Sequence, residues 1–110
     1  MSQADKSARP LAYMVKLLPP RASFLVDATP AERAIMREHA DYWRAHLEDG
    51  LVVAFGPVND PAGSFGIGLV RVSEAAELDD FLACDPAIQS GIGLQVQALP
   101  MPALISSCAP

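Results

Sequence analysis

The sequence has few basic side chains and no long apolar run. Lys and Arg number 8 against 13 Asp and Glu, so the net charge of −5 provides no attraction toward nucleic acid or an anionic membrane. No apolar stretch reaches the roughly 18 residues that a membrane span needs, and the opening MSQADKSARP lacks the apolar segment of a signal peptide. We therefore expect a cytoplasmic protein that binds neither nucleic acid nor membranes.

Cysteines and cofactor motifs are equally scarce. Cys84 and Cys108 form no CxxC pair and have no second metal-type cluster nearby, which argues against a disulfide framework and against a zinc site. Gly66 and Gly68 lie in a strand-like segment and lack the following helix that a phosphate-binding loop requires, so close backbone packing or a β-bulge explains them better. The sequence predicts no metal and no organic cofactor.

The clearest element that the sequence does contain is a helix over residues 29–50 with both ends marked. Thr29 suits the N-cap, Pro30 the first helical position, and Glu32 the third position, where its carboxylate can complete a capping box. Gly50 suits the C-terminal cap because glycine readily adopts the left-handed conformation. At about 100° per residue, one helix face is apolar and the opposite face is charged. The predicted inward stripe comprises Ile35, Met36, His39, Trp43, His46 and Leu47.

The rest of the pattern alternates strands with helices. Strands are predicted over residues 11–18, 51–58, 65–72 and 91–99. A second helix over 74–85 begins after Ser73 as its cap, and the segments 19–28 and 86–91 are predicted loops. The buried side of that helix is predicted to comprise Ala75, Leu78, Phe81 and Leu82. The order βαββαβ predicts an α+β domain with a four-stranded antiparallel sheet and both helices on one face.

This domain is predicted to span residues 11–99, between short tails at 1–10 and 100–110. Helices that cover only one face of a sheet leave its other face open. Because the strands carry apolar residues on both faces, a second copy of the chain is the expected cover. The sequence therefore predicts a homodimer.

His39 is the candidate for chemistry, since imidazole titrates near neutral pH and can both accept and donate a proton. A histidine on an apolar stripe is also often a core residue with satisfied nitrogens. Asp85, where the second predicted helix ends, is the natural partner of His39, although an Asp-Pro pair also commonly marks the end of a helix without any other role. The residues alone leave both interpretations open.

Four further residues are candidates for substrate binding. Arg21 offers a positive charge to an anionic substrate, although a loop arginine is often only solvated, and Phe24 lies in the same loop, which is long enough to line a cleft. Gly56 and Pro57 form the other pair. His46 lies two helical turns beyond His39, about 10 Å along the axis, so one metal ion cannot take both; we interpret it as a helix-end histidine favoured by the dipole.

Several of these segments together resemble the YCII-related (YciI-like) family. They are the early strand followed by LPPR, the Glu38-His39 pair within a helix, GLVVAFGPVNDPAG, SEAAELDDFLACDP and the later Gly91, within residues 11–99. The resemblance implies a ferredoxin-like domain of the dimeric α/β-barrel type, in which two sheets pack face to face. It also implies a cleft with a histidine and an aspartate as an acid/base pair, and these correspond to His39 and Asp85.

Two features depart from the family pattern, namely Ala87-Ile88 after the Asp-Pro pair and the tail after Leu99. Both bear on the size and shape of the substrate rather than on the fold. The combined prediction is a small enzyme, of lyase, isomerase or hydrolase-like type, in which His39 oriented by Asp85 moves a proton on a small ring-bearing or anionic metabolite. The alternative is a non-catalytic dimeric module that binds a ligand in the same pocket. A monooxygenase of the wider dimeric-barrel class is a third interpretation, by fold analogy alone.

Overall fold

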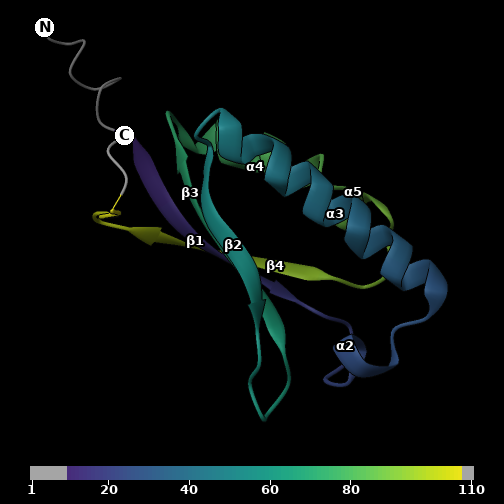
Figure 1. Ribbon diagram of the computed structural model, residues 1–110. Coiled ribbons are helices and arrows are strands. Elements are labelled where there is room, and N and C mark those ends of the chain that lie inside the picture. The colour runs from purple at the N-terminus through teal and green to yellow at the C-terminus, as the bar shows by residue number, and fades with distance from the viewer. Residues whose placement is uncertain (1–9, 108–110) are drawn as a thin grey trace, which may run out of the picture.

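Strands and helices alternate along residues 10–107, the part of the chain that the computed structural model describes (Figure 1). In chain order they are β1 Leu11–Leu18, α2 Phe24–Asp27, α3 Pro30–Glu48, β2 Val52–Val58, β3 Phe65–Val72, α4 Ala75–Ala83, α5 Pro86–Gln89 and β4 Gln95–Met101. The predicted N-terminal tail, apart from Pro10, and Cys108 lie outside the described residues. No helix within residues 10–107 is long and apolar enough to cross a membrane.

The four strands form one antiparallel sheet in the order β2-β3-β1-β4. Val15 in β1 pairs with Gly68 of β3 on one side and with Ala98 of β4 on the other. The strands that α3 connects, β1 and β2, are separated by β3, and the strands that α4 connects, β3 and β4, are separated by β1. The predicted α+β class and four-stranded antiparallel sheet are confirmed, and this interleaved order is that of a ferredoxin-like fold.

Both long helices cover the same face of the sheet, as predicted (Figure 1). The burial of apolar side chains between the helices and this face drives their packing. The core between them consists of Val15, Trp43, Val52, Val70, Val72, Leu78 and Phe81. The core therefore lies under the middle and C-terminal half of α3, the helix that carries His39.

The predicted capping box at the start of α3 is present. Thr29 Oγ1 accepts the Glu32 amide at 3.1 Å, Glu32 Oε1 accepts the Thr29 amide at 2.8 Å, and Pro30 is the first helical residue. The helix ends at Glu48 with Asp49 as C-cap, and Gly50 follows in the left-handed region at φ 84°. Local sequence signals thus determine both ends of α3.

The inward stripe of α3 differs from the prediction at Leu47, which is 40% exposed. The reason is the position of α4, which packs on the Tyr42 side of the stripe. Tyr42 stacks on Phe81 of α4 at a centroid distance of 5.1 Å and donates a hydrogen bond to the Phe81 carbonyl at 2.7 Å. The buried face of α3 is therefore turned toward Tyr42, and Leu47 lies at its outer edge.

Two segments that were predicted as loops contain short helices. Residues Phe24–Asp27 form α2 inside the segment 19–28, and residues Pro86–Gln89 form α5. The second helix ends at Ala83 rather than at Asp85, because Asp85 instead caps α5 through its carboxylate. Each of these helices is a single turn held by local hydrogen bonds. A segment of four residues is too short to show the apolar periodicity from which a helix is predicted.

Three smaller predictions are also corrected. The N-cap of α4 is Glu74 and not Ser73, whose backbone N–H and hydroxyl instead donate hydrogen bonds to Glu77 Oε1. Ala75, which was predicted on the buried side of this helix, is exposed in its first turn. The fourth strand begins at Gln95, since Gly91 and Gly93 adopt positive φ in the preceding turn. It continues through Met101, past the predicted end, because β4 is an edge strand that tolerates a proline.

Candidate active site

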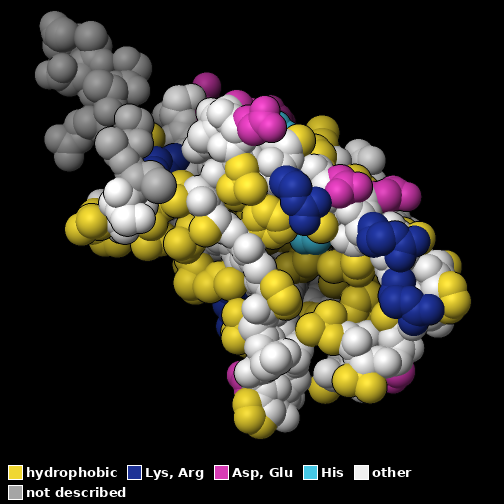
Figure 2. All heavy atoms as spheres, in the orientation of Figure 1, with side chains coloured by type: hydrophobic (Ala, Val, Ile, Leu, Met, Phe, Trp, Pro, Cys, Tyr) yellow, Lys and Arg dark blue, Asp and Glu magenta, His cyan; other side chains and the backbone are white. Residues whose placement is uncertain are grey.

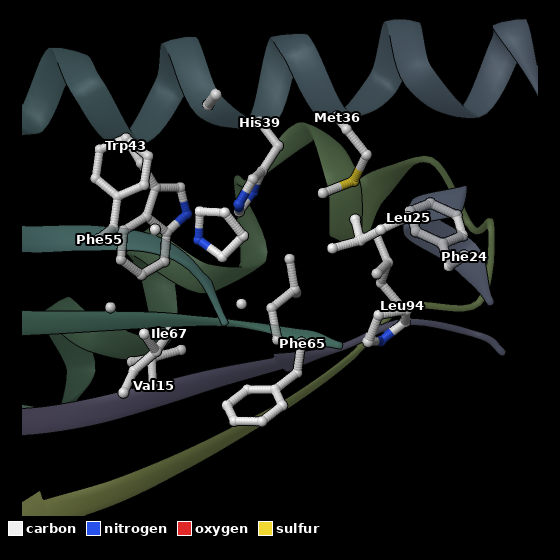
Figure 3. Close-up of a pocket in the computed structure, with 17 residues that line it drawn as sticks. Val15, Phe24, Leu25, Met36, His39, Trp43, Phe55, Phe65, Ile67 and Leu94 are labelled. Carbon is white, nitrogen blue, oxygen red and sulfur yellow. The ribbon is translucent and has the colours of Figure 1, made fainter. Parts of the chain in front are cut away.

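His39 points from the middle of α3 toward the sheet (Figure 3). Asp85, at the junction of α4 and α5, contacts its ring. His39 Nδ1 lies 2.8 Å from Oδ2 and 3.0 Å from Oδ1 of Asp85. The His39 side chain is 12% exposed and the Asp85 side chain 2%. The predicted pairing of these two residues is therefore present, at direct hydrogen-bond distance.

The Asp85 carboxylate is fully enclosed and accepts three N–H groups. Besides His39, Trp43 Nε1 donates to Oδ2 at 2.7 Å, and the Ala87 amide donates to Oδ1 at 2.9 Å. Among residues 10–107, Asp85 is the only charged side chain in the buried class. A buried carboxylate is stable only when donors replace the lost water, and these three donors do so.

The position of Asp85 follows from the proline after it. Pro86 excludes the helical region for the preceding residue, and Asp85 is extended at φ −65° and ψ 126°. The helical conformation is interrupted there between α4 and α5, so the carboxylate can cap α5 and contact His39 of α3. Asp85 therefore both separates the two helices and pairs with His39.

The second nitrogen of the imidazole, Nε2, forms no hydrogen bond to any residue within 10–107. Because the carboxylate faces Nδ1, that nitrogen carries the proton in the neutral ring, and Nε2 presents its lone pair. His39 lines a cavity between α3 and the sheet. The imidazole therefore lines this cavity with its Nδ1 occupied by Asp85 and its Nε2 without a partner among the described residues.

The cavity has a volume of about 220 Å³. Figure 2 shows a histidine side chain beneath the outer edge of α3, next to a hollow surrounded by apolar side chains. Met36, Leu25, Phe24 and Leu94 gather at one end of it (Figure 3). Its lining residues are Val15, Leu17, Pro19, Phe24, Leu25, Met36, His39, Ala40, Trp43, Phe55, Gly56, Pro57, Phe65, Gly66, Ile67, Gly68 and Leu94. Apart from the imidazole and an indole N–H already bonded to Asp85, this lining offers no polar side-chain group.

Three of the four predicted substrate-binding residues, Phe24, Gly56 and Pro57, lie on this lining. The fourth, Arg21, does not. Its Nε donates to Asp27 Oδ1 at 2.8 Å, and its Nη atoms donate to the Glu32 carboxylate at 2.8 and 3.1 Å. The guanidinium is therefore engaged by two carboxylates outside the cavity.

The ion pairs of Arg21 shift the titration of all three groups. Hydrogen bonds to Glu32 and then to Asp27 raise the pKa of Arg21 further above its usual range. Hydrogen bonds from Arg21 and from the Thr29 backbone lower the pKa of Glu32 to about 2. The pKa of Asp27 is lowered by hydrogen bonds from Ser23 and then Arg21. Each shift favours the charged form, so the cluster fastens α2 to the start of α3.

Comparison with known proteins supports the relationship that the motifs indicated. The model of the YCII-related domain matches residues 13–102. The chain belongs to the YCII-related family. A search of curated proteins found no match.

In this YCII-related domain, Trp43 is a site residue that the sequence had indicated only as packing. Its indole N–H shares Oδ2 of Asp85 with His39, and its ring packs on Gly68, where a Cβ would overlap the indole. The close backbone packing predicted for Gly68 is thus confirmed. Trp43 lies four residues after His39, which places both on one helix face, and this spacing was the available signal.

His46 lies apart from the cavity of the YCII-related domain. Its Nδ1 is 2.9 Å from Asp49 Oδ2, and its ring contacts Phe81 and Tyr42 edge-on. Burial raises the pKa of the neighbouring Tyr42 to about 12. No group of three or more metal-binding side chains gathers within residues 10–107, and the exposed Cys84 thiol does not line the cavity.

Proposed function

We propose that this YCII-related domain is a small enzyme in which His39, oriented by Asp85, transfers a proton on a small metabolite. The observation that carries the proposal is the arrangement of the imidazole, with Nδ1 against a buried carboxylate and Nε2 free at an apolar cavity. A carboxylate in this position selects the tautomer and stabilises the imidazolium that forms when Nε2 takes a proton.

The reaction requires one cycle of the imidazole. Nε2 removes a proton from the substrate, the imidazolium remains paired with Asp85, and the proton then returns to another substrate atom or to a leaving group. The cavity lining has no Ser or Cys side chain, so covalent catalysis by such a nucleophile is not part of the proposal. Proton transfer of this kind corresponds to an isomerase or a lyase.

We expect His39→Ala to slow the exchange of the substrate proton by a factor of about 10² to 10⁴, while the protein remains folded. A metabolite panel incubated with the protein in D₂O and followed by NMR detects deuterium entering any substrate carbon whose proton is removed. His46→Ala is the matched control, because it removes the other histidine of the same helix, which lies outside the cavity. Unchanged exchange in a folded His39→Ala protein would refute the proposal.

A non-catalytic binding module is the second candidate. It is favoured by the lack of a further polar side-chain group on the lining that would stabilise charge developing on a substrate. A ligand that is recovered unaltered, without deuterium incorporation, would support the module over the enzyme.

We also propose that two copies pack through their open sheet faces as a dimeric α/β barrel. Val15 faces the helices, so the neighbouring Met14 and its partners Leu69 and Leu99 face away from them. These apolar side chains from three strands would be covered by the same surface of a second copy.

Light scattering at micromolar concentration is expected to give the mass of a homodimer, with an interface above about 1,200 Å² in total. Leu99→Glu should shift the protein toward monomer, because it places a charge in the apolar face. Val26→Glu is the matched control, since Val26 is 90% exposed on α2 rather than on the sheet. A wild-type monomer throughout the micromolar range would contradict the dimer.

A further inference from the structure

We propose that the cavity takes an uncharged, largely apolar molecule of the size of one substituted ring, whose single weakly acidic O–H or C–H faces His39 Nε2. This inference rests on the proposed function, since it names the class of substrate for the same site. It follows from the volume of the cavity, the charge of its lining and the position of His39 Nε2, the one side-chain nitrogen of that lining without a hydrogen-bond partner among residues 10–107.

The volume limits the ligand to about one ring. An engineered apolar cavity of about 150 Å³ holds benzene, and each further water-sized group occupies about 30 Å³. The cavity beside His39 measures about 220 Å³. The difference of about 70 Å³ leaves room for about two substituents on a ring.

The charge of the lining excludes an ionised group from the interior. None of the lining side chains is a lysine or arginine, and Arg21, the nearest candidate in the sequence, is held by Asp27 and Glu32. A positive charge on His39 would be balanced by Asp85, which lies directly behind it. An anion in this cavity would therefore lose its hydration without gaining a free counter-charge.

The polar contact that the cavity offers has a defined direction. Nδ1 points at Asp85, and the Trp43 N–H also points at Asp85, so both donors are used. His39 Nε2 remains as a hydrogen-bond acceptor, so a matching ligand must donate a hydrogen bond to it. A ligand with several polar groups would leave the others unpaired against apolar side chains, at a cost for each group. One donor on an apolar body is the chemistry that fits.

Three probes of one shape test this ligand class: toluene, 4-methylphenol and 4-methylbenzoate, titrated near neutral pH. The Trp43 indole N–H resonance reports binding, because this is the only tryptophan in the chain and its ring lines the cavity. We expect 4-methylphenol to bind about three- to tenfold more tightly than toluene through its hydrogen bond to Nε2. The ionised 4-methylbenzoate should bind at least about tenfold more weakly than 4-methylphenol.

Two substitutions of alanine by leucine on α3 test whether the probes bind in this cavity. Ala40 lines the cavity, whereas Ala45 of the same helix is exposed and does not. Ala40→Leu should fill part of the cavity and weaken 4-methylphenol binding at least about tenfold, while Ala45→Leu leaves it unchanged. His39→Ala should remove the preference for 4-methylphenol over toluene without abolishing toluene binding.

The proposal is overturned if 4-methylbenzoate binds most tightly of the three probes, or if no probe shifts the Trp43 indole resonance at concentrations up to the probe's solubility limit. It is also overturned if Ala45→Leu weakens 4-methylphenol binding as much as Ala40→Leu does. These outcomes are separate from a failure of the enzyme proposal. Tight, His39-dependent binding of 4-methylphenol together with His39-independent deuterium exchange would refute the catalytic role and leave the ligand class standing.

Discussion

Replacing Asp85 with alanine is expected to lower the free energy of unfolding by about 3–5 kcal/mol, because three buried N–H donors lose their acceptor at a cost of about 1–3 kcal/mol each. The Asp85 side chain is 2% exposed, and its carboxylate accepts hydrogen bonds from His39, Trp43 and the Ala87 amide. Alanine leaves all three donors in a site that water enters poorly, and each unpaired donor carries its own desolvation cost. It also removes the cap of α5.

Urea denaturation of Asp85→Ala and wild type measures this difference. Asp79→Ala is the matched control, because Asp79 is an exposed aspartate of α4 and its loss should change stability by less than about 0.5 kcal/mol. Asp85→Asn should be intermediate, since an amide oxygen still accepts one or two of the donors while its NH₂ group faces the others. A loss below about 1 kcal/mol for Asp85→Ala would mean that the three hydrogen bonds do not support the fold.

The fold could be predicted where local signals and tertiary packing agree. The capping box at Thr29 defines the start of α3 before any tertiary contact is considered. Leu47 was assigned to the wrong environment because the period of a helix gives the direction of its apolar face but not which edge a second helix will cover. That edge depends on the packing of Tyr42 against Phe81, which are far apart in the sequence.

The candidate site could be predicted in its central pair and not in its surroundings. His39 followed from its helix face, and its pairing with Asp85 followed from the family resemblance. Trp43 was missed as a donor because its acceptor lies 42 positions away, where spacing carries no information. The engagement of Arg21 was missed for a different reason: a loop arginine finds its carboxylates only once α2 has formed and placed Asp27 beside it.

Replacing Trp43 with alanine is expected to cost about 3–5 kcal/mol in unfolding free energy, as for other truncations of large aromatic core residues. The side chain is 3% exposed, and its ring lies 4.9 Å from Phe81 and 5.9 Å from Phe55 between centroids. Alanine opens a void among these rings and also leaves Asp85 without one of its three donors. Trp43→Phe keeps much of the ring but not the N–H, so it should cost less, about 1–3 kcal/mol.

A double-mutant cycle with Gly68 tests whether the indole itself causes this cost. A Cβ at Gly68 would overlap the Trp43 ring, so Gly68→Ala should destabilise the wild type by about 1–3 kcal/mol. In a Trp43→Ala background the same methyl group enters vacated space, and its cost should largely disappear, giving a coupling above about 0.5 kcal/mol. Gly66→Ala serves as the control, since a Cβ there meets Leu17 rather than Trp43 and should behave alike in both backgrounds. Additive effects of Gly68→Ala and Trp43→Ala would show that the indole does not pack on Gly68, and with that contact the position of Trp43 between the sheet and Asp85 would also be wrong.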